Sequence, residues 1–237
     1  MACRGATAPE RIVGWHAPTL VALAVALAGR PLVYTLVDPA PLIGTLDADH
    51  GRRPWWLFHL WILLFQWIPF FVAWWALHRG ARPWSAYGVD WSWFRRRRAP
   101  LLAVAAVVAG CAVLAPRYWY GGDLPRVSQT LPLLPVSPLE RIFFMLASVS
   151  AGICEETCYR GLPLRGVAGS YAGALALLPV TVVSFVFVHG WYGLEHAGAY
   201  ASAGLIFGGA FLLLRRRRLE WLIVAHGIID ALYALAP

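Results

Sequence analysis

The feature that most constrains this chain is a series of apolar blocks, each long enough to cross a lipid bilayer. Hydrophobic residues make up 59% of the 237 residues, and charged residues only 14%. A helix needs about 20 apolar residues to cross roughly 30 Å of hydrocarbon. We therefore expect an all-α, polytopic membrane helix bundle that forms a single domain over residues 1–237. Seven blocks give the expected spans, at 17–37, 55–77, 99–115, 139–159, 171–189, 198–214 and 219–236.

The basic residues predict how the bundle is oriented. All 20 are arginines, gathered at the ends of the apolar blocks, which does not suit nucleic-acid binding. Short cytoplasmic loops carry the excess of basic residues. One side collects fourteen arginines and the other five, which predicts a cytoplasmic N-terminus and an outside C-terminus. A chain without lysine is typical of a GC-rich bacterial gene, so we expect the bacterial inner membrane.

The start of the chain has two interpretations. Ala26-Leu27-Ala28 follows a basic N-terminus and resembles a signal-peptide cleavage site. The apolar stretch continues past it to Val37, which favours an uncleaved first span.

Ionisable residues inside the apolar blocks are the main functional signal, since a charge in the bilayer is costly unless it faces a partner or a cavity. The fourth block ends with Glu155, Glu156 and Arg160. Glu156 and Arg160 are four residues apart in the order that favours an ion pair on a helix. Glu155 is turned about 100° away from that pair. A carboxylate in such apolar surroundings is a natural candidate for a general base.

Two histidines stand in later blocks. His189 ends the fifth block and follows Phe185 by four residues. In the seventh block, His226 precedes Asp230 by four residues, so the carboxylate can accept from one ring nitrogen and leave the other to a reacting atom. We therefore expect the acidic and imidazole groups of three separate helices to share one site.

These three motifs, Glu-Glu-x-x-x-Arg, Phe-x-x-x-His and His-x-x-x-Asp, in this order resemble the CPBP intramembrane protease family. That family includes the CAAX prenyl proteases and bacterial relatives linked to bacteriocin immunity. The resemblance suggests a protease core at about 139–237 and implies an intramembrane glutamic endopeptidase without a metal ion or cofactor. It implies that Glu155 and His189 activate water, Glu156 and Arg160 form a supporting pair with Phe185 nearby, and His226 with Asp230 stabilises the oxyanion.

Two features fit that pattern poorly. The prenyl proteases have Asn where this chain has Asp230, and an ionised carboxylate cannot donate to an oxyanion. We therefore expect His226 to meet the oxyanion and Asp230 to fix the tautomer of the ring. Counting along the spans also leaves Glu155 and His189 about 20 Å apart in depth. Their meeting requires a fourth helix that continues past Gly161, or a break at Pro179.

Other functions remain open at this stage. Glu155, His189, His226 and Asp230 could hold zinc in a metalloprotease, although the sequence has no His-Glu-x-x-His motif. A non-catalytic immunity or scaffold protein, or a proton-coupled transporter, would also place such groups in spans. Cys154 and Cys158 are expected to be packing residues. The partners we expect are the bilayer and a membrane-associated peptide substrate, which could be a prenylated protein, a bacteriocin-type peptide or a C-terminal sorting tail.

Overall fold

We analysed a computed structural model of the chain, which describes residues 16–29, 31–33, 53–89, 135, 137–189 and 197–232. All regular elements of the part described are helices, in agreement with the expected all-α bundle. Its elements are α1 (Ala17–Ala24), η1 (Val25–Gly29), α4 (Arg53–Arg79), η2 (Trp84–Tyr87), α6 (Pro138–Glu156), η5 (Thr157–Val167), α7 (Tyr171–His189), α8 (Ala197–Leu213) and α9 (Leu219–Leu232).

Three helices of the described part are long and apolar enough to cross a membrane: Trp55–Arg79, Pro138–Val167 and Tyr171–His189. The helix over Ala17–Val33 and α8 are apolar but shorter. The predicted span at 99–115 and the end of the last one lie outside the described residues, so the count of seven stays a prediction. These helices make the protein an integral membrane protein.

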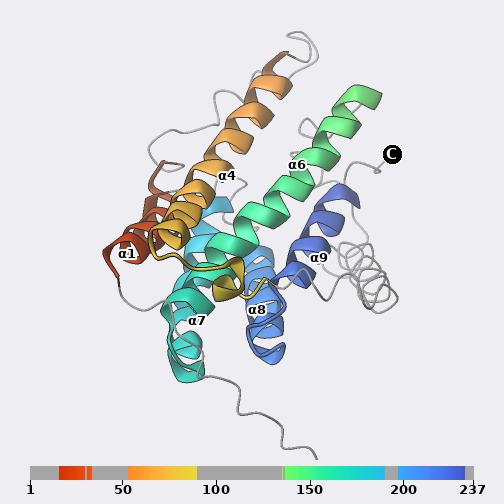
Figure 1. Ribbon diagram of the computed structural model, residues 1–237. Coiled ribbons are helices and arrows are strands. Elements are labelled where there is room, and N and C mark those ends of the chain that lie inside the picture. The colour runs from red at the N-terminus through yellow and green to blue at the C-terminus, as the bar shows by residue number, and fades with distance from the viewer. Residues whose placement is uncertain are drawn as a thin grey trace, which may run out of the picture.

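Helix α6 is the centre of the arrangement, with α4 on one side and α9 on the other (Figure 1). Its start is fixed by a capping box, in which the Ser137 hydroxyl accepts from the Glu140 amide and the Glu140 carboxylate accepts from the Ser137 amide. Pro138 stands in the first turn, where its missing N–H costs nothing.

The predicted end of the fourth span at residue 159 is wrong. The helix does not stop at Arg160 but continues as the π-helical segment η5 to Val167, which makes one apolar rod from Pro138 to Val167. Arg160 is only 2% exposed and therefore belongs to the interior, not to a cytoplasmic loop. Glu155 consequently lies inside the long rod and not near its end.

Side chains from distant segments fasten the end of η5. Arg165 donates to the carbonyl oxygens of Ser85 and Arg216, and Arg216 donates to those of Leu164 and Ser170. At least one arginine of the run 215–218 thus has a structural role besides any part in topology.

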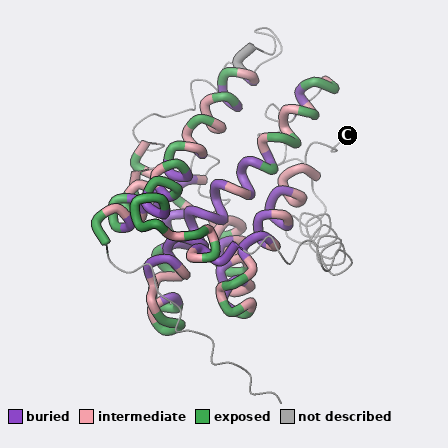
Figure 2. Tube along the Cα trace, in the orientation of Figure 1, coloured by how far each residue is buried: buried purple, intermediate pink, exposed green. Residues whose placement is uncertain are grey.

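Burial is greatest where α6, η5 and α9 meet (Figure 2). By contrast, α4 exposes a stripe of large apolar side chains along most of its length. Such a stripe suits contact with lipid. Its members are Leu57, Leu60, Leu64, Ile68, Phe71 and Trp74.

Candidate active site

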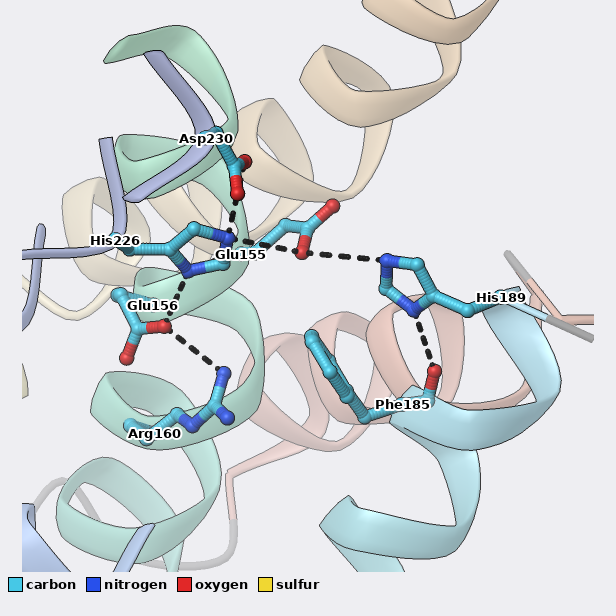
Figure 3. A network of polar contacts seen from close by, with 7 residues as sticks. All are labelled: Glu155, Glu156, Arg160, Phe185, His189, His226 and Asp230. Carbon is cyan, nitrogen blue, oxygen red and sulfur yellow. Dashed lines mark hydrogen bonds and ion pairs between the residues drawn. The ribbon is translucent and has the colours of Figure 1, made fainter. Parts of the chain in front are cut away.

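Three helices bring the predicted site residues together (Figure 3). Glu155 and Glu156 stand at the end of α6, with Arg160 one turn later in η5. The C-terminal part of α7 contributes Phe185 and His189, and α9 contributes His226 and Asp230. All seven side chains form one connected network of polar and ring contacts.

A close approach of two backbones sets the distance between α6 and α9. A Cβ atom on Gly152 would lie 2.5 Å from the Ile223 carbonyl oxygen and 3.0 Å from the Gly227 nitrogen. A Cβ atom on Gly227 would in turn lie 3.3 Å from the Val149 Cα. The two helices can therefore come into contact only because both positions lack a side chain. This contact between α6 and α9 places His226 next to Glu155 and Glu156.

Glu156 joins two of the predicted motifs. One of its carboxylate oxygens, Oε1, accepts from Arg160 Nη1 at 3.0 Å and from His226 Nδ1 at 2.7 Å. Glu156 is fully buried and Arg160 is 2% exposed. Removing one partner of such a buried pair would leave an uncompensated charge in apolar surroundings.

The ring of His226 contacts two carboxylates, that of Asp230 on the same helix and that of Glu156 on another. Asp230 Oδ2 does lie near the ring of His226, but at 3.4 Å from Nε2, the nitrogen that faces Glu155. The other nitrogen, Nδ1, is held by Glu156. The i, i+4 spacing on α9 could not reveal this, because the stronger partner comes from another helix.

His189 is oriented by its own helix. Its Nδ1 lies 2.7 Å from the carbonyl oxygen of Phe185, one turn earlier in α7. A carbonyl oxygen only accepts, so Nδ1 carries the proton and Nε2 presents a lone pair. Nε2 lies 4.0 Å from Glu155 Oε2.

Glu155 stands between the two imidazoles. Its Oε2 atom is 4.0 Å from His189 Nε2 and 3.7 Å from His226 Nε2. The residue is 2% exposed, whereas the Asp230 side chain is 35% exposed. Both distances from Glu155 are too long for direct hydrogen bonds and short enough for one water to bridge the groups.

The difference in depth between Glu155 and His189 that the predicted spans implied is therefore absent from the structure. Because α6 continues into η5, Glu155 lies well before the end of the rod, at the level reached by the C-terminal end of α7. Of the two solutions considered, the structure has the continued helix; α7 runs unbroken through Pro179.

Aromatic rings line the network, and two of them were missed by the sequence analysis. Arg160 lies over the rings of Phe185 and Phe207, at 4.9 and 5.5 Å. Tyr200 of α8 stacks on His189, with ring centroids 4.4 Å apart and planes at 19°. Gly204 and Gly208 of α8 face side chains of α7, Val182 and Leu178 respectively.

The described part of the chain contains no group of three or more His, Cys, Asp or Glu side chains placed to hold a metal ion together. Cys154 and Cys158 are buried cysteines, outside any disulfide, on the same stretch of helix as the glutamates. Both belong to the core cluster that includes Phe70 and Phe185.

Comparison with known proteins identifies the segment that carries this network. No curated protein and no solved structure matches the chain. A protein-family model described as "Type II CAAX prenyl endopeptidase Rce1-like" matches residues 137–232, from the cap of α6 to the end of α9. That range contains every residue of the network and agrees with the resemblance seen in the sequence. Residues 137–232 are thus similar to the Rce1-like type II CAAX prenyl endopeptidases, and this match supports the CAAX-protease resemblance.

Proposed function

We propose that the protein is an intramembrane endopeptidase in which Glu155 activates a water for attack on a peptide bond. One observation carries the proposal: Glu155 Oε2 lies within 4.0 Å of ring nitrogens that come from two other helices. The match of residues 137–232 to a peptidase family supports peptidase activity, and the glutamate-based mechanism is our inference from the geometry.

The orientations of the two histidine rings favour this role for Glu155. Each ring has its Nδ1 next to an acceptor, the Phe185 carbonyl for His189 and the Glu156 carboxylate for His226. Each Nε2 is therefore turned toward Glu155. A water bound there would donate to Glu155 and to His189 Nε2, which leaves its oxygen lone pair free to attack.

The reaction can then proceed without a covalent intermediate. The water oxygen bonds to the carbonyl carbon of the peptide while its proton passes to Glu155. The negative charge that develops on the carbonyl oxygen is met by His226, which donates from Nε2 in its doubly protonated form. Collapse breaks the C–N bond, and the amine leaves with the proton that Glu155 held.

In this mechanism Glu156 orients His226, and Arg160 binds the same carboxylate oxygen of Glu156. The sequence analysis gave this orienting role to Asp230. Asp230 instead lies beside Nε2 at the more exposed side of the network, close to where the oxyanion would form.

The substrate is a membrane-associated protein or peptide whose scissile bond reaches the depth of Glu155. Type II CAAX peptidases act on prenylated C-termini by the name of the family, while a bacteriocin-type peptide or a C-terminal sorting tail would present a similar end. We assign the protein to the bacterial inner membrane with a cytoplasmic N-terminus, on the basis of the arginine excess.

The test is comparative membrane proteomics of the native host, with the parent gene replaced by Glu155→Ala. We expect at least one membrane-associated protein to accumulate uncut. The purified variant should lose roughly 10²- to 10⁴-fold in cleavage rate, the usual contribution of a general base. A variant that cleaves like the parent would refute the mechanism.

Two measurements separate the alternatives. Activity that survives exhaustive chelation, with no stoichiometric metal in the purified protein, distinguishes the glutamate mechanism from a zinc metalloprotease. An unchanged membrane proteome, together with no cleavage by the purified parent protein, would favour a non-catalytic immunity or scaffold role.

A further inference from the structure

Helix α4 lies outside the segment that matches the peptidase family, yet it carries a buried amide. Gln66 stands in the middle of the apolar span Trp55–Arg79 and is 6% exposed. Its Oε1 atom is buried and has no hydrogen-bond partner among the described residues. A buried polar group without a partner costs free energy, and within a membrane no solvent water compensates for it. An amide in such a place therefore calls for an explanation.

The register of the two helices brings Gln66 close to the depth of the Glu155 carboxylate. Helices α4 and α6 pack side by side and run in the same direction (Figure 1). Near their first turns, Trp56 packs on Phe143 with ring centroids 5.1 Å apart, and His59 on Phe144 at 5.8 Å. Counting forward from these contacts brings Gln66 level with residues 151–153 of α6. Glu155 is then within about one helical turn along the axis.

The amide also belongs to the face of α4 that packs on α6. Phe70, one turn after Gln66, lies in the same core cluster as Cys154 and Cys158. Cys154 immediately precedes Glu155 in the chain. The opposite face of α4 at this depth is the lipid-exposed one, represented by Leu64 at 60% exposure. Gln66 is thus the buried amide of the inner face, at the depth of the carboxylate.

A substrate would supply what this amide lacks. A peptide bond that is to be hydrolysed must be unwound, and its main-chain N–H and C=O groups then need partners within the membrane. A carboxamide offers one acceptor and two donors, so it can bind both groups of an extended main chain.

We propose that Gln66 is a substrate-binding residue, whose carboxamide hydrogen-bonds the main chain of the unwound substrate next to the scissile bond. The inference rests on the proposed function. It assigns the ligand class as an extended peptide main chain, recognised without regard to side-chain sequence.

The first test compares Gln66→Leu with Leu64→Ala on the lipid face, using the full chain in proteoliposomes. The probe is a quenched-fluorescence peptide with a farnesylated cysteine fourth from its C-terminus. If the parent protein does not cleave this peptide, the substrate is instead the protein that accumulates in Glu155→Ala membranes. We expect Gln66→Leu to raise KM about 3- to 10-fold with kcat nearly unchanged, as for loss of a binding contact of ordinary strength. Its Tm should equal or exceed that of the parent, because no hydrogen bond of the free protein is lost. Leu64→Ala should leave KM unchanged.

The second test identifies the hydrogen bond itself. Ester linkages replace single amides of the probe on each side of the scissile bond, which removes one main-chain N–H at a time. At one position the ester should raise KM for the parent protein and have no further effect on Gln66→Leu.

The outcomes separate this inference from the proposed function. If the parent cleaves neither substrate, the proposed function fails and the role of Gln66 with it. If the parent cleaves a substrate but Gln66→Leu has the parental KM, only the role of Gln66 is refuted. The same holds if, at every ester position, the effects of the ester and of Gln66→Leu on KM multiply as independent effects do. A joint fall in kcat and Tm would show a structural role and would also overturn the inference.

Discussion

The contact between α6 and α9 should control activity through the position of His226, and Gly152→Ala tests this. The new Cβ would lie 2.5 Å from the Ile223 carbonyl oxygen, so α9 must move away by about 0.5–0.9 Å to restore a separation of 3.0–3.4 Å. The same shift would lengthen the 2.7 Å contact between His226 Nδ1 and Glu156 Oε1 to roughly 3.2–3.6 Å. A displacement of this size at a reacting group costs up to about 10²-fold in rate. The cost in folding free energy should be about 1–3 kcal/mol, as for other overpacked sites.

The assay is cleavage of a membrane-anchored peptide by the purified variant, with a thermal melt of the same preparation. Gly209→Ala in α8 is the matched control, because a Cβ there meets nothing within 4 Å. That control should keep parental activity and gain about 0.5–1 kcal/mol, since alanine is the better helix former. A folded Gly152→Ala protein with more than half the parental rate would refute the argument that this backbone contact positions His226.

Five further substitutions, at four positions, test individual side chains. Cys154→Ala and Cys158→Ala should each cleave within about 2-fold of the parent rate, because neither thiol takes part in the proposed reaction; loss of activity in both would make sulfur the nucleophile. Asp230→Asn should keep or raise kcat, since an amide can donate to the oxyanion while Glu156 still holds His226. A loss of about 10²-fold or more in kcat would instead show that Asp230 orients the ring of His226. Tyr200→Phe should preserve the stacking on His189 and the activity, whereas Tyr200→Leu should lower kcat about 2- to 10-fold, in proportion to a lost aromatic contact; equal rates for the two variants would show that the stacking is irrelevant.

Local sequence patterns predicted which residues form the site better than which of these residues contact one another. Helical spacing alone identified the Glu156–Arg160 pair, which the structure has at 3.0 Å. The same spacing joined His226 to Asp230 and overlooked Glu156, because a contact between residues 70 positions apart leaves no periodic signal. Tyr200 and Phe207 escaped notice for a similar reason. Aromatic residues are common in apolar helices, and only the packing of α8 shows which of them touch a histidine.

The boundaries of the elements were the weakest part of the sequence analysis. Hydropathy located α4, α7 and α8 to within a few residues, but it ended the fourth span near Arg160 because a charged residue normally marks the edge of the bilayer. The span at 99–115 lies outside the described residues, and its existence stays a prediction.

The misplaced boundary and the active site have one physical origin. An arginine ends a membrane helix when its charge must reach water, but it can stay inside when a carboxylate one turn earlier neutralises it. Arg160 and Glu156 do this in the interior, and the helix passes through them for seven more residues to Val167. That continuation moves Glu155 from the edge of the span to the depth of His189. The pair therefore has two effects: it lets the helix run on, and it supplies the acceptor that holds His226. A variant that breaks the pair, such as Arg160→Met, should consequently disturb the depth of Glu155 and the orientation of His226 together.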